Sequence, residues 1–177
     1  MTPILAFLTH APGLGERNSP VMKEFQDRTE AAFASAVGTE GFLAHVAKHV
    51  DGSFGLHGPS STELENRAVI WGGRDDVVAP FFLKYPDVPT TFSFWNSLES
   101  VGAFAYRGLH AEALKMRTQW FAKTEYPVFV AWWLKDSEML PTREEAIRRL
   151  VLLHENGSTP EAFNFKASFD ADGNSVK

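Results

Sequence analysis

The stretch "PVFVAWWL", residues 127–134, is a dense apolar run that decides the fold. Its length and its β-branched and aromatic side chains indicate a buried strand. Because successive side chains of a strand point to opposite faces, Trp132 and Trp133 must lie on opposite faces of the sheet. Both faces are therefore apolar, and helices of the chain are expected to cover one of them. A second copy of the domain is the economical cover for the other, so the sequence predicts a homodimer.

Strand and helix patterns alternate along the rest of the chain. Apolar or alternating runs predict further strands at 4–9, 41–50, 67–72, 90–95 and 162–169. Helical spacing and end signals predict helices between Ser19 and Gly38, from Leu98 to about Phe121 with a break near Gly108, and between Thr142 and Gly157. The order is a ferredoxin-like βαββαβ pattern with an extra helix and strand, which makes the fold α+β. The Gly- and Pro-rich segment 51–89 is the irregular part, and its length is typical of a functional loop or lid.

Composition limits the class of protein. The 177 residues fit a single domain, here placed at 1–170 with a flexible tail at 171–177. The net charge of -5 argues against nucleic acid as a partner. The absence of Cys excludes disulfides and thiolate metal sites, and the apolar run near the N-terminus is too short for a signal peptide or a membrane span. A cytoplasmic protein that does not enter membranes is therefore expected.

Two polar side chains interrupt an amphipathic helix in "YRGLHAEALKMRTQWF", residues 106–121. His110, Leu114, Arg117 and Phe121 follow one another at spacings of four, three and four, so they share one helix face. Three interpretations are open. In the first, the face borders solvent and both polar groups form hydrogen bonds at its rim. In the second, it lines a cavity in which the imidazole binds haem iron and the guanidinium binds a carboxylate. In the third, it lines a substrate pocket in which His110 is an acid or base without a cofactor.

Other candidates have simpler explanations. His45 and His49 have metal-ligand spacing on a helix, but a strand would hold them about 13 Å apart at 3.3 Å per residue. "HGPSS" at 57–61 and "WGGRDD" at 71–76 are typical of turns, although Arg74 could reach an anionic ligand. The tryptophans at 95, 120, 132 and 133 are expected in the core, or as walls of a flat pocket.

A resemblance extends these patterns. The segments "FSFWNSLESVGAFAYRGLHAEALKMRTQWF", "VFVAWWL" and "LPTREEAIRRLVLLHENGSTPEAFNFKASF" resemble the DUF3291 family over Thr90 to Phe169. That resemblance implies the dimeric α+β barrel superfamily, in which two ferredoxin-like sheets pack face to face. The superfamily includes cofactor-free monooxygenases and haem proteins such as chlorite dismutases, dye-decolourising peroxidases and aldoxime dehydratases. "HAEA" at 110–113 followed by "WF" is also similar to spheroidene monooxygenases, which contain haem, and implies that His110 is an axial ligand.

The leading hypothesis from the sequence is a haem-dependent oxidoreductase or monooxygenase-like enzyme acting on a small organic substrate. In it, His110 is the iron ligand and Arg117 or Arg107 contacts a propionate or a substrate acid. Leu114, Phe121 and Trp95 are expected to line the cofactor site. Two alternatives stay open: a cofactor-free oxygenase or isomerase of the same fold, and a non-enzymatic dimer that binds a small molecule.

Overall fold

A five-stranded antiparallel sheet forms the centre of the computed structural model, which describes residues 3–67, 76–135 and 139–176 and omits the side chains of 108–110 and 113. The strand order is β3-β2-β4-β1-β5. The strands are β1 (Ile4–His10), β2 (Phe42–Lys48), β3 (Phe54–His57), β4 (Thr90–Trp95) and β5 (Phe129–Leu134). Without the edge strand β3, this is the strand order of a ferredoxin-like α+β fold, as the sequence predicts, and the sheet does not close into a barrel.

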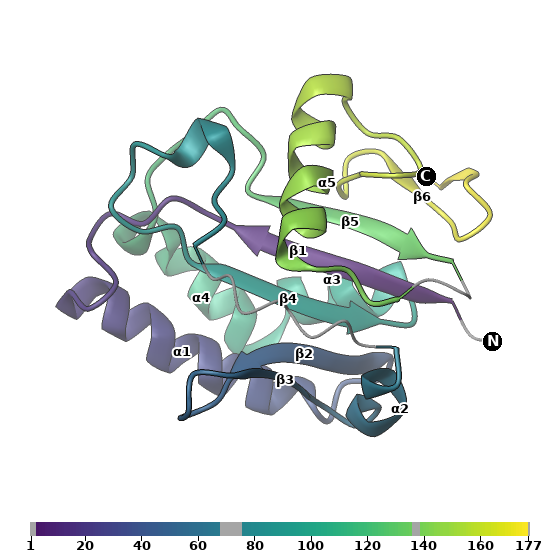
Figure 1. Cartoon of the computed structure of the whole chain (residues 1–177), viewed down its shortest axis with the longest axis horizontal. Coiled ribbons are helices and arrows are strands. Elements are labelled where there is room, and N and C mark those ends of the chain that lie inside the picture. The colour runs from purple at the N-terminus through teal and green to yellow at the C-terminus, as the bar shows by residue number, and fades with distance from the viewer. Residues whose placement is uncertain (1–2, 68–75, 136–138, 177) are drawn as a thin grey trace.

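Helices cover both faces of the sheet. On the far side in Figure 1 lie α1 (Pro20–Ala36), α3 (Leu98–Tyr106) and α4 (Gly108–Trp120), and α5 (Arg143–Asn156) lies on the near side. The short elements are α2 (Ser61–Glu65), the 3₁₀ turn η1 (Pro80–Phe82) and the hairpin of β6 (Ser168–Phe169) and β7 (Ser175–Val176). None of the helices in the described part of the chain combines the length and the apolar character needed to cross a bilayer.

Strand register explains why both faces are apolar. Leu5 pairs with Trp95 on one side and with Trp133 on the other, which makes one row of side chains across three strands. The next row, on the opposite face, joins Ala6 to its partners in β4 and β5, and Trp132 is one of them. The two adjacent tryptophans therefore point to opposite faces, as the period of a strand requires.

The face with Trp132 is covered by the chain's own helix α5. Trp132 is only 1% exposed and belongs to the same apolar cluster as Ile147 and Leu150 of α5. The guanidinium carbon of Arg149 lies 5.8 Å from the centre of its ring. The extra helix thus covers the face over β5 and β1 that the sequence argument assigned to a second copy, and the homodimer stays a prediction.

Most helix and strand predictions are confirmed. The strands expected at 4–9, 41–50 and 90–95 are β1, β2 and β4, and the expected helix break is the extended residue Arg107 between α3 and α4. Ser19, Ser97 and Thr142 are N-caps that accept backbone N–H groups of their helices. The strand expected at 67–72 falls almost entirely on 68–75, outside the described residues.

The strand expected at 162–169 is wrong over most of its length. Phe163 makes one isolated bridge to Ala131, and the chain then turns because the side chain of Asn164 accepts the N–H of Lys166. Regular pairing resumes only at Ser168–Phe169, whose partner Ser175–Val176 lies within the segment expected as a tail.

Leu150→Ala tests whether α5 packs on the sheet. Leu150 is fully buried, so truncation should lower the free energy of unfolding by about 2–5 kcal/mol in chemical denaturation. Glu155→Ala on the exposed side of the same helix is the control and should change it by less than about 0.5 kcal/mol. Equal effects of the two substitutions would contradict the packing of α5.

Candidate anion-binding cavity

Trp95 is a core residue in the structure. Its side chain is fully buried, its indole N–H donates to the Ser93 hydroxyl at 2.9 Å, and its ring centre lies 5.0 Å from that of Phe42. These contacts fill the space between β4, β2 and α3, so Trp95 packs as the core interpretation expects.

The predicted site residues of α4 and of its two ends differ in burial. Arg107 and Arg117 are exposed, Leu114 is half-buried, and Phe121 packs edge-on against Phe25 of α1 with ring centres 4.8 Å apart. His110 has a helical backbone, but its side chain lies outside the described part of the chain. Because the side chain of His110 is outside the described part of the chain, the site predicted on this helix face stays a prediction.

The histidines of the β2–β3 hairpin lie close to one another. His45 pairs with His57 across the strands with ring centres 5.9 Å apart, and His49 lies 5.2 Å from His57. Burial, followed by the neighbouring His57, lowers the pKa of His45 to about 4. Within residues 3–67, 76–135 and 139–176, no group of three or more His, Cys, Asp or Glu side chains is arranged to hold a metal ion.

A cavity of about 340 Å³ opens where α1, the β2–β3 hairpin and the beginning of α5 meet at one end of the sheet. It is lined by Arg17, Gln26, Glu30, Val46, Lys48, Phe54, Thr90, Phe92 and Arg143. This volume lies in the range of small-molecule sites. We call it the end cavity.

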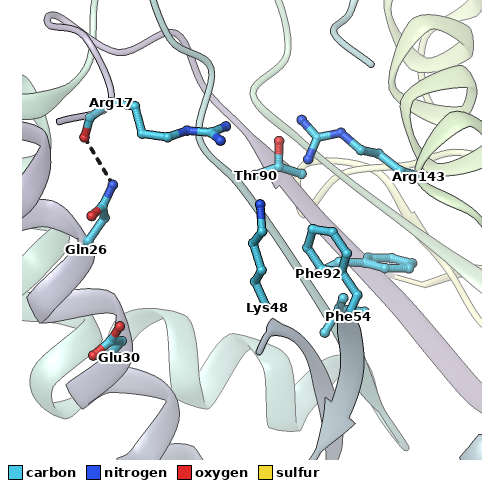
Figure 2. Close-up of a pocket in the computed structure, with 9 residues that line it drawn as sticks. Arg17, Gln26, Glu30, Lys48, Phe54, Thr90, Phe92 and Arg143 are labelled. Atoms are coloured by element: carbon cyan, nitrogen blue, oxygen red, sulfur yellow. Dashed lines mark hydrogen bonds between the residues drawn. The ribbon is translucent and has the colours of Figure 1, made fainter. Parts of the chain in front are cut away.

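Three cations reach into the end cavity from separate elements. Figure 2 shows the side chains of Arg17, Lys48 and Arg143 converging on the space around Thr90. Arg17 comes from the β1–α1 loop, where its backbone carbonyl accepts a hydrogen bond from the side-chain amide of Gln26 at 3.2 Å. Its Nε lies 3.5 Å from Oδ1 of Asp87. Lys48 is the last residue of β2. Three cationic side chains therefore line the end of the cavity around Thr90, and Arg17 among them pairs with Asp87.

Arg143 is the buried member of this group. It is 6% exposed, and its Nε donates to the Val77 carbonyl at 2.9 Å. Arg143 is also the first residue of α5, where the helix dipole disfavours a cation. Its position is thus explained by its tertiary contacts, and the helix N-terminus adds to the positive potential at the cavity.

The floor of the end cavity is apolar. Phe92 is almost fully buried and stacks on Trp132 with ring centres 5.7 Å apart, which fixes its ring. Val46 and Phe54 lie beside it on β2 and β3, and the Lys48 ammonium lies 5.5 Å from the centre of the Phe54 ring. The cavity thus has apolar lining residues next to a group of cationic side chains.

His10 connects the cavity to the core. Its Nε2 accepts the backbone N–H of Ala79 at 3.1 Å, and its Nδ1 lies 2.8 Å from the Thr90 hydroxyl. The Thr90 hydroxyl lies 3.1 Å from the Val88 carbonyl. Burial, followed by the charge of Arg143, lowers the pKa of His10 to about 3, so the ring is neutral at ordinary pH.

Haem does not fit the end cavity. Haem iron takes a His, Cys, Met or Tyr ligand, and the lining residues that the structure describes include none of these. Both ring nitrogens of His10 already have partners. The haem hypothesis depends on the side chain of His110 and stays a prediction, as do the roles of Arg107 and Arg117.

Sequence reasoning missed the main residues of this cavity, although Arg143 and the neighbouring His10 each left a signal. His10 continues the buried alternation of Ile4, Ala6 and Leu8, so it is a polar residue on an apolar strand face. Arg143 is a cation in the first turn of a helix. Arg17 and Lys48 gave no signal, because exposed cations at loop and strand ends are common.

A family comparison matches the model of the "Domain of unknown function (DUF3291)" to residues 4–177. The chain belongs to the DUF3291 family. The match extends well beyond the segment Thr90 to Phe169 that carried the resemblance, and it takes in β1, α1 and both sides of the end cavity. Searches of curated proteins and of solved structures found no match.

Acid should destabilise the protein partly through His10. The folded pKa of about 3 lies below the unfolded value of 6.5, so below pH 6.5 the unfolded chain takes up a proton that the folded chain excludes. Stability present above pH 6.5 is therefore lost progressively towards pH 3, by about 2 kcal/mol from this residue between pH 7.5 and 5.

Chemical denaturation at the two pH values measures this loss. The pH-dependent loss should be about 2 kcal/mol smaller in His10→Gln, which has no group that titrates there. An equal loss in the wild type and the variant would show that His10 is not held neutral.

Proposed function

We propose that this protein binds a small organic anion in the end cavity. The observation that supports this is the convergence of three cations over an apolar floor in a cavity of about 340 Å³. Among them, Arg143 is the buried one, and a buried guanidinium gains most from a carboxylate or phosphate with matching planar or forked geometry. The apolar body of the ligand would lie against Phe54 and Val46, the partly exposed apolar residues of the lining.

Binding is supported better than a chemical step. Among the lining residues as described, Glu30 is the one carboxylate, and it lies on α1, away from Arg143 (Figure 2). His10 uses both ring nitrogens in hydrogen bonds and does not line the cavity, so it is not placed to act as a general base. The cavity therefore matches the small-molecule-binding alternative raised by the sequence.

Lys48→Met tests the proposal by removing one cation while keeping an unbranched side chain of similar length. With phenylacetate as the probe, isothermal titration calorimetry should show affinity weakened by about tenfold to a hundredfold, since a charged hydrogen bond contributes about 1.5–3 kcal/mol. Affinity for the wild type should also fall as salt is raised, because part of the attraction is electrostatic.

Lys166→Met is the matched control, because this exposed lysine lies in the C-terminal segment and does not line the cavity. It should bind like the wild type. Absence of binding to the wild type, or equal weakening in both variants, would overturn the proposal.

The haem hypothesis predicts a different result. If His110 binds iron, haemin added to the protein should give a Soret band that His110→Ala abolishes, whereas Lys48→Met leaves it unchanged. Absorption spectra of the three proteins check this. If haemin gives no Soret band with the wild type, the haem hypothesis is wrong and the end cavity remains the proposed site.

A further inference from the structure

The hydrogen-bond chain behind the end cavity has a fixed direction. A backbone N–H can only donate, so Ala79 makes Nε2 of His10 the acceptor. The proton of the neutral ring is then on Nδ1, which donates to the Thr90 hydroxyl at 2.8 Å. A backbone carbonyl can only accept, so the hydroxyl proton of Thr90 goes to Val88.

This direction leaves Thr90 as an acceptor at the cavity wall. A hydroxyl has one proton and two lone pairs. The proton is committed to Val88 and one lone pair to His10, so the second lone pair is what the hydroxyl can offer to a ligand. Thr90 lines the cavity, and its oxygen lies between the guanidinium groups of Arg17 and Arg143 in Figure 2.

We propose that the ligand of the end cavity is a hydroxy acid, whose hydroxyl donates to Thr90 while its acid group lies against Arg143. The proposal rests on the anion binding proposed above and names its ligand class. The second lone pair of the Thr90 hydroxyl calls for a donor on the ligand. Of the common donors, a neutral hydroxyl suits a wall at which the cationic side chains of Arg17, Lys48 and Arg143 also lie, since it brings no further positive charge.

Three ligands of nearly the same shape test the inference on the wild type alone. They are 2-hydroxy-2-phenylacetate, its 2-methoxy analogue and phenylacetate, which share the carboxylate and a phenyl ring for Phe54 and Val46. The hydroxy acid should bind about threefold to tenfold more tightly than the other two, which is the usual strength of one neutral hydrogen bond. The methoxy analogue shows whether the preference depends on hydrogen-bond donation or only on the presence of an oxygen substituent, because it keeps the oxygen and loses the proton.

Substitutions at Thr90 then test whether its hydroxyl causes the preference for the hydroxy acid. Thr90→Ser keeps the hydroxyl and should keep the preference for the hydroxy acid. Thr90→Val keeps the shape and should remove the preference while all three acids still bind through the cations. Because Thr90→Val leaves the N–H of His10 without its partner, circular dichroism must first show that the variant is folded, and the wild-type comparison stands without it.

The outcomes separate the two proposals. If none of the three acids binds, the proposed function fails. If they bind with equal affinity, or if the methoxy acid binds best, anion binding stands and the assignment of a hydroxy acid is overturned. A preference for the hydroxy acid that survives in Thr90→Val also overturns the role of Thr90.

Discussion

The hydrogen-bond chain from the N–H of Ala79 through His10 and Thr90 to the carbonyl of Val88 is the constraint on which the functional end of the molecule depends. It attaches both ends of the segment between Ala79 and Val88 to strands β1 and β4. His10 and Ala79 are fully buried, so breaking the bond between them leaves a buried donor and acceptor without a partner, at a cost of about 1–3 kcal/mol. The same segment begins beside the Val77 carbonyl, which holds Arg143. One network thus fixes the cavity wall and its buried cation.

Helix α5 connects the fold to the cavity. Its apolar side covers the face of the sheet that contains Trp132, and its first residue is Arg143. Phe92 belongs to both regions, because it stacks on Trp132 and forms part of the cavity floor. Packing of the core therefore determines where the guanidinium lies relative to the apolar floor. The cavity needs no rigid loop of its own, since β2, β4 and α5 position most of its lining.

The sequence predicted the fold well where the signal was local. The strand at Thr90–Trp95 and the cap at Thr142 depend on neighbours in the chain, and both are present in the structure, although residues 92–95 are all buried and the polar side of the alternation is covered as well. The strand predicted at 162–169 is wrong over most of its length because the side chain of Asn164 stabilises a turn there. The alternation of apolar residues does not reveal such a turn. The cavity could not be predicted from the sequence for a different reason, because Arg17, Lys48 and Arg143 are separated by long stretches of chain. Their convergence depends on how α5 crosses the sheet, and no spacing rule encodes that.

The protonation of the His10 ring tests this account most directly, because the direction of the whole chain follows from it. Nitrogen-15 NMR of the imidazole identifies which nitrogen has the proton and whether the ring titrates. The account predicts a neutral ring protonated at Nδ1 from pH 8 down to pH 5, with Nε2 unprotonated as the acceptor of the Ala79 N–H. A ring protonated at Nε2, or one that becomes charged near its ordinary pKa of 6.5, would contradict it.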